Sequence, residues 1–137
     1  MGGLPYDQAT APTAAVGAFS GQALVVREPL GDAMSAYDLG RLEVTVTAER
    51  EVVGRVTGQA EALADIDCDF TGTWTPESAG NVHYIFAQFI RPTVESACPL
   101  HDQILYGMMV MDIEGDAQQW VLTNPVTGFH LAAHVLR

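Results

Sequence analysis

Apolar and polar side chains alternate most regularly over Asp65–Thr75. One set of alternate positions is apolar or small, and the other holds only Asp and Thr; the first set is Ile66, Cys68, Phe70, Gly72 and Trp74. A period of two kept over eleven positions is typical of a β-strand that buries one face and exposes the other. We therefore expect a strand here, with Trp74 buried and Thr73 on the surface.

Seven further segments have strand character, and the links between most of them have the length of a hairpin. They are Ala18–Arg27, Arg41–Glu49, Val53–Leu63, Val82–Arg91, Ile104–Glu114, Gln119–Thr123 and Phe129–Leu136. Val82–Arg91 and Ile104–Glu114 are apolar on both faces, whereas the second and third segments alternate cleanly. Leu30–Leu39 contains turn-type residues, and we expect a loop there.

This pattern predicts an all-β protein, because no segment of ten or more residues has the period of a helix. Short sequential links favour an antiparallel meander, and eight such strands close into a small barrel of lipocalin-like architecture. A β-sandwich is the alternative. Residues 1–16 contain Gly-Gly, two Pro and an Ala/Thr mixture, so we expect a flexible tether before a single barrel domain at 17–137.

The segment Thr71–Trp74 reads Thr-Gly-Thr-Trp. It resembles the Thr-Gly-x-Trp strands of lipocalin-like and avidin-like barrels. In those families the motif lies on the first strand, whereas here it lies in the middle of the chain. The resemblance covers four residues, and no functional residue of those families is carried across to this protein.

The chain is strongly acidic, with a formal net charge of −11 and six positive side chains that are all Arg. Such a surface repels phosphate, so we expect no nucleic-acid partner and little attraction to anionic membranes. No run of about 18 apolar residues occurs, so no transmembrane segment is expected. A basic protein or a neutral ligand remains compatible with this charge.

Two cysteines, Cys68 and Cys98, suggest a disulfide between the predicted buried strand face and a loop. Two buried thiols are the alternative. A disulfide implies an oxidising compartment, and hence a secreted protein, periplasmic or extracellular, whose signal peptide has been removed. A lipoprotein tether at the start of the chain and a cytoplasmic location both stay open.

Metal ligation is not predicted by any motif in the chain. Asp65, Asp67 and Asp69 match the opening of a calcium loop, but Phe70 and Pro76 stand where that loop needs Gly and Glu. The cysteine spacing does not fit a structural zinc site. We therefore expect these carboxylates to form a solvated strand face.

Catalytic residues are not assigned. His101 and Asp102 are neighbours and are candidates for a general base, but no nucleophile stands out beside them, Ser96 being close only in sequence. His130 and His134 lie four apart in a predicted strand, so we expect two exposed histidines. Nucleotide loops and redox motifs are missing from the sequence, and we expect no cofactor.

The aromatic and Met side chains of the predicted strands suggest a ligand cavity inside the barrel. We expect it to be lined by Phe70, Trp74, Tyr84, Phe86, Tyr106, Met108 and Trp120. Several inward positions hold Gly or Ala, so a partly empty apolar interior is one outcome and a fully packed barrel is the other.

These observations favour an exported, non-catalytic binding barrel for a small apolar ligand or a protein partner. Two alternatives stay open. One is a small barrel enzyme of the cyclase or isomerase type acting on an apolar substrate. The other is an acidic, inhibitor-like module that binds a basic protein. The sequence does not predict the oligomeric state.

Overall fold

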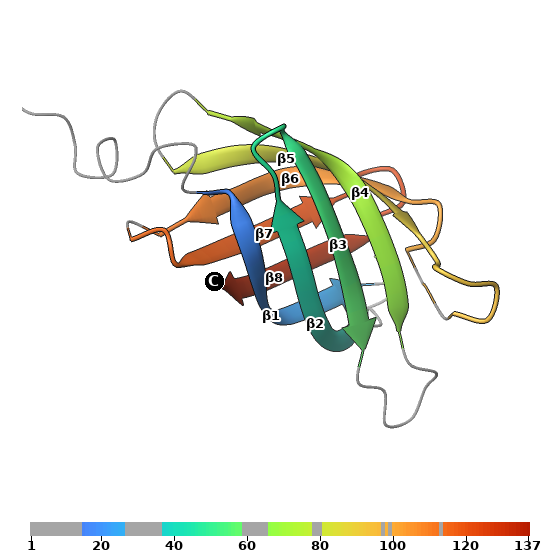
Figure 1. Cartoon of the computed structure of the whole chain (residues 1–137). Helices are drawn as coiled ribbons and strands as arrows, with labels where there is room; N and C mark the ends of the chain where they lie inside the picture. Colours follow the sequence, from blue (N-terminus) through green and yellow to red (C-terminus); the bar gives the residue numbers. More distant parts are fainter. Residues whose placement is uncertain are drawn as a thin grey trace, which may run out of the picture.

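A computed structural model describes residues 15–26, 37–58, 66–77, 81–96, 98, 100–112 and 114–137. Its eight strands form a closed antiparallel barrel in sequential order, as predicted, and β1 closes the barrel against β8. The strands are β1 (Gly17–Val26), β2 (Tyr37–Val46), β3 (Glu51–Gly58), β4 (Asp67–Pro76), β5 (Val82–Ile90), β6 (Ile104–Met111), β7 (Ala117–Thr123) and β8 (His130–Leu136). In Figure 1, β1 to β4 cross in front of β5 to β8. Most of the expected tether, residues 1–14, lies outside the described residues.

Strand β2 begins earlier than the sequence suggests, because Tyr37 to Leu39 pair with β1 instead of belonging to the predicted loop. Backbone pairing with a neighbouring strand extends a strand regardless of local propensity, so turn-type residues do not prevent it. Strand β3 ends at Gly58, and the rest of its predicted length lies outside the described residues.

The alternation predicted for β4 is confirmed. Phe70 and Trp74 are at most 1% exposed, while Thr71, Thr73 and Thr75 are exposed. Gly54 on β3 pairs with Phe70, and any side chain there would collide with the Phe70 ring. The glycine at this inward position therefore allows the Phe70 ring to pack directly against the backbone of β3.

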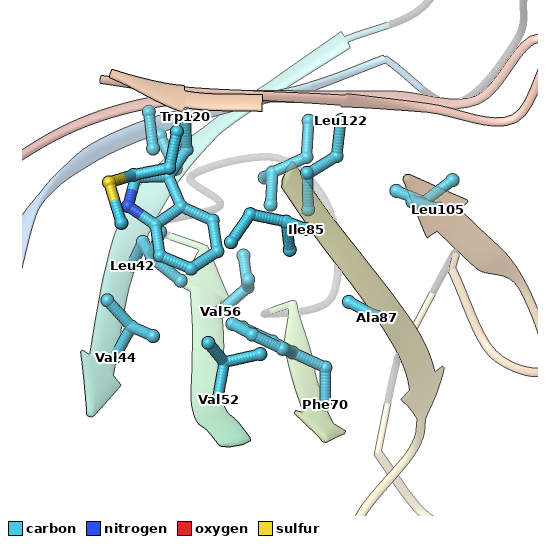
Figure 2. Close-up of a cluster of buried hydrophobic side chains, with 14 of the residues drawn as sticks. Leu42, Val44, Val52, Val56, Phe70, Ile85, Ala87, Leu105, Trp120 and Leu122 are labelled. Atoms are coloured by element: carbon cyan, nitrogen blue, oxygen red, sulfur yellow. The ribbon is translucent and has the colours of Figure 1, made fainter. Parts of the chain in front are cut away.

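The core fills the inside of the barrel with side chains from every strand. Figure 2 shows Phe70 of β4 and Trp120 of β7 pointing into the same buried cluster, together with side chains of β2, β3 and β5. The largest of the fully buried apolar side chains are Trp74, Trp120, Phe70 and Phe89. Burying each such side chain stabilises the fold by about 1.5–3 kcal/mol.

The predicted disulfide is present. Cys68 on β4 is bonded to Cys98 in the loop between β5 and β6, with the two Cα atoms 5.1 Å apart. Leu100, two residues further along, is fully buried. The bond thus holds the β5–β6 loop against the inward side of β4.

At the opposite end of the barrel, the hairpin between β2 and β3 covers Trp74. The Trp74 indole N–H donates to the Thr47 carbonyl at 2.9 Å, and the Arg50 guanidinium lies 4.4 Å from the ring centroid. Arg50 itself has φ 70°, in the left-handed region of the turn.

The described part of the chain contains no helix long and apolar enough to cross a bilayer.

Candidate binding surface

Three of the predicted cavity residues do lie inside the barrel. Phe70, Trp74 and Trp120 are almost fully buried. The centroid of the Phe70 ring lies 4.9 Å from that of Phe89 and 6.4 Å from that of Trp120, within the range of aromatic contact. These rings pack against one another inside the barrel.

Buried polar groups near one end of the barrel are joined by hydrogen bonds that sequence reasoning missed. The Trp120 indole N–H donates to Gln118 Oε1 at 2.9 Å, and Gln118 Nε2 donates to the Ala15 carbonyl at 3.1 Å. The signal in the sequence is that Gln118 shares the parity of Trp120 on the same strand. Gln118 therefore satisfies the indole and anchors the residues just before β1.

His83 is the other buried polar side chain, and its sequence context gave no indication of this. It is 0% exposed, and neither ring nitrogen has a hydrogen-bond partner among the described residues. Its ring centroid lies 5.3 Å from that of Trp74. Burial lowers the pKa of His83, and the positive charge of Arg50 lowers it further. The imidazole is therefore held neutral inside the barrel.

Four predicted cavity residues lie on the outside of the barrel instead. Tyr84, Phe86, Tyr106 and Met108 are 48%, 47%, 45% and 45% exposed. The prediction was wrong for them because β5 and β6 are apolar on both faces. Pairing with β4 determines which face of β5 points outward. Thr73, which is exposed, lies opposite Phe86, and directly paired residues point to the same side of a sheet.

These four residues belong to a continuous apolar surface on β5, β6 and β7, which we call the outer apolar face. Its members, each 38–56% exposed, are Tyr84, Phe86, Ile90, Ile104, Tyr106, Met108, Val110 and Val121. Pairing makes them neighbours: Tyr84 lies opposite Met108, which lies opposite Val121 on its other side. The remaining outward positions of these three strands hold Val, Ala, Gln and Thr, with no charged side chain.

The outer apolar face is large for a protein of this size. Its exposed fractions, taken with about 150–200 Å² for each fully exposed side chain, give roughly 650 Å² of apolar surface. The largest apolar patch on a typical monomer is about 300–600 Å² and often functional. Tyr84 stands at the border, where a hydrogen bond to Glu77 raises the pKa of its hydroxyl.

A hollow of about 360 Å³ continues the outer apolar face across β7, β8 and β1. The row that runs through Tyr84, Met108 and Val121 reaches Ala132 on β8. The small Ala132 side chain lies in the hollow between larger neighbours, among them Val121 on β7 and Leu24 on β1. The surface thus has large side chains on one side and a depression on the other.

The outward side of β2, β3 and β4, which we call the charged wall, has a different character. The Arg55 guanidinium donates to both carboxylate oxygens of Asp67, at 2.8 and 3.0 Å, and lies 3.8 Å from Asp69. The hydrogen bond from Arg55 lowers the pKa of Asp67. A groove of about 630 Å³ crosses this wall, and its lining combines charged and apolar side chains: Glu43, Arg55, Asp69, Val53, Ile90 and Leu136.

The residues considered for catalysis are not brought together. His101 Nε2 lies 3.4 Å from Asp102 Oδ2, and His101 Nδ1 accepts from the Arg91 backbone N–H at 3.1 Å. The Ser96 hydroxyl instead bonds to Thr93 at 2.8 Å and donates to Asp67 at 3.4 Å. Within these residues there is no pairing of a nucleophile with a base.

His130 and His134 are both exposed, as expected from their place in a strand. Among the described residues, no group of three or more His, Cys, Asp and Glu side chains is placed to hold a metal ion. No known family model, curated protein or solved structure matches the chain.

Proposed function

We propose that this chain is an exported, non-catalytic binding barrel that binds a protein partner through its outer apolar face. The observation that supports this most is the roughly 650 Å² of contiguous, uncharged apolar surface on β5 to β7. Aromatic and Met side chains are enriched in protein interfaces, and charged ones are depleted at their centres. The disulfide between Cys68 and Cys98 supports export, because such bonds persist in oxidising compartments.

A protein partner suits this surface better than a small ligand. Inside the barrel, buried rings such as Phe70 and Trp120 pack against each other, and the two hollows described above open on the outside of the wall. A small-molecule site buries most of its ligand in a concave pocket. The outer apolar face is wide and open, which is the shape of a surface that another protein covers.

The two alternatives receive less support. An enzyme acting on an apolar substrate needs polar groups that face a cavity, but the buried Gln118 side chain already bonds to Trp120 and to the Ala15 carbonyl. The buried His83 packs against Trp74. Binding of a basic protein relies on the net charge of −11, and the outer apolar face contributes no charge to it. Apolar contact is therefore the interaction that this surface offers.

The proposal can be tested by photocrosslinking in cells that export the protein. Tyr106, at the centre of the outer apolar face, is replaced by the photoreactive p-benzoylphenylalanine. The matched control places the same group at Val53, which is 51% exposed on β3. We expect a protein adduct from position 106 that Met108→Glu abolishes, and none from position 53. Adducts confined to a single chain, or equal adducts from both positions, would refute the proposal.

A further inference from the structure

The shape and charge of the outer apolar face also indicate which protein covers it. Resting on the function proposed above, we infer that the partner is a second copy of this chain. The two copies pack face to face about a two-fold axis that runs parallel to the strands, between β6 and β7. This arrangement places Tyr84 of each copy over the Ala132 hollow of the other.

The first argument is complementarity of shape along the strand rows. One row runs through Tyr84, Met108, Val121 and Ala132 on four consecutive strands. The two large side chains lie on β5 and β6, and the two smaller ones lie on β7 and β8. A two-fold axis between β6 and β7 exchanges the two halves of the row. It therefore sets Tyr84 against Ala132 and Met108 against Val121, which is the self-complementarity of an isologous interface.

In the next row the gradient of size holds only on the two middle strands, because Thr123 is paired with His130 on β8 and the axis therefore sets Phe86 against His130. Phe86 on β5 lies opposite Tyr106 on β6, and Tyr106 lies opposite Thr123 on β7. The same axis sets Tyr106 of one copy against the smaller Thr123 of the other. It also runs β5 over β8 and β6 over β7, so the two faces meet as aligned sheets, about 10 Å apart and within about 30°.

The second argument is electrostatic. Each copy carries a formal net charge of −11, so two copies repel each other wherever charged surfaces approach. The outward positions of β5, β6 and β7 hold no charged residue, so two copies that meet on this face bring no like charges into direct contact there. Added salt screens the remaining repulsion. Self-association should therefore strengthen with ionic strength, whereas binding to a basic partner would weaken.

The area is sufficient for a reversible dimer. Roughly 650 Å² on each copy gives about 1,300 Å² for the pair, which falls within the range of standard interfaces of about 1,200–2,000 Å². Area alone does not set affinity, but an interface of this size without buried ion pairs is compatible with a dissociation constant on the order of 10 µM.

Sedimentation velocity of the purified full chain over about 1–300 µM tests the inference, because this range brackets a constant on the order of 10 µM. We expect the mass to rise from 14.7 kDa toward twice that value, and to do so at lower concentration as salt increases. Val121→Glu should weaken the dimer by more than about tenfold. Val53→Glu is the matched control, because both residues are valines on strands with similar exposure: Val121 on β7 is 56% exposed and Val53 on β3 is 51% exposed. It should leave the dimer intact.

A complementation experiment tests the geometry itself. Tyr84→Ala leaves the hollow of the other copy empty, and Ala132→Tyr fills it, so each variant should be impaired in pairing with itself. When the two variants are mixed, one of the two symmetry-related contacts places the truncated position 84 against the enlarged position 132, and the other is the native contact. We expect the mixture to form a heterodimer more tightly than either variant forms a homodimer. Two impaired variants that fail to restore each other would overturn the proposed axis.

The outcomes separate this inference from the proposed function. The chain could stay monomeric over the whole concentration range and still give an adduct with a different protein from position 106. That result would overturn the inference that the partner is a second copy, and it would support the outer apolar face as a binding surface. An absence of interprotein adducts in cells, together with a monomer in solution, overturns both. A dimer weakened equally by Val121→Glu and Val53→Glu places the interface elsewhere and also overturns the inference.

Discussion

The charged wall and the outer apolar face are two parts of one barrel wall whose outward side chains differ in chemistry. Strands β2 to β4 and strands β5 to β7 all bury one set of alternate side chains in a common core. Outside, Arg55 pairs with Asp67 in the charged wall, whereas Tyr106 and Met108 meet solvent on the other side. The same pattern of inward burial is thus compatible with a charged outer surface on one side and an apolar outer surface on the other.

The largest expected effect concerns which face of a strand supports the fold. Trp74→Ala should lower the free energy of unfolding by roughly 3–5 kcal/mol, because it removes a buried ring with its contacts to His83 and Arg50. Thr73→Ala, next to it but exposed, should change the free energy by less than about 1 kcal/mol. Urea melts measure both. Comparable losses would mean that the two faces of β4 are reversed.

The disulfide links the two sides of the comparison, since it ties β4 of the charged wall to the loop between β5 and β6. Its cysteines are 30 residues apart, and closing such a loop should stabilise the fold by about 3–4 kcal/mol in the chain-entropy model. The double variant Cys68→Ala with Cys98→Ala should lose that amount in a urea melt. Free thiols in the unsubstituted protein, denatured without reductant, would show that the disulfide does not form.

A smaller effect, dependent on pH, comes from His83, which β5 buries against Trp74. Because the pKa of folded His83 lies below its ordinary value of 6.5, the unfolded chain takes up a proton more readily. The free energy of unfolding should therefore be highest above pH 6.5 and decrease as the pH falls toward the folded-state pKa.

His83→Phe removes the titrating group and keeps a ring against Trp74, so it should flatten this dependence. Denaturant melts at about pH 7.5 and pH 5 on both proteins measure the difference, one value lying on each side of the ordinary histidine pKa. An equal loss of stability in the variant would show that another group is responsible.

The smallest effect is expected in the charged wall. Arg55→Met keeps the apolar stem but removes the charge that lowers the pKa of Asp67. The pair is solvent-exposed, so stability at neutral pH should change little. Its contribution is present above pH 3.8, the ordinary value for Asp, and is lost as the pH falls below it. A large loss in the free energy of unfolding at neutral pH would show that this ion pair contributes substantially to stability.

The sequence predicts most of the fold because polar residues mark the outside of β2, β3 and β4. Cys68, Phe70 and Trp74 could be placed inside for this reason, and the Cys68–Cys98 bond followed from that placement. On β5 and β6 both sets of alternate positions are apolar. The face of Phe86 is decided only by its register opposite Thr73, which local pattern does not contain.

The candidate surface could not be found from the sequence for the same reason. Large exposed side chains such as Tyr84 and Met108 resemble core residues when only their chemistry is known. Conversely, His83 and Gln118 resemble surface residues, although both are fully buried. In each case the pairing of neighbouring strands decides which way the side chain points, whatever the ordinary preference of the residue.

Adjacent methionines provide the most direct test of the central claim that the apolar side chains of β6 serve a partner on the outside. Met108 is 45% exposed and Met109 is 0% exposed. Peroxide should convert Met108 to the sulfoxide much faster than Met109 in dilute protein, and fragment-ion mass spectrometry resolves the two sites. At high protein concentration, where the second copy covers the face, we expect the oxidation rate of Met108 to fall at least several-fold. A Met108 rate that does not change with protein concentration would contradict the second copy as the partner, and faster oxidation of Met109 would contradict the central claim.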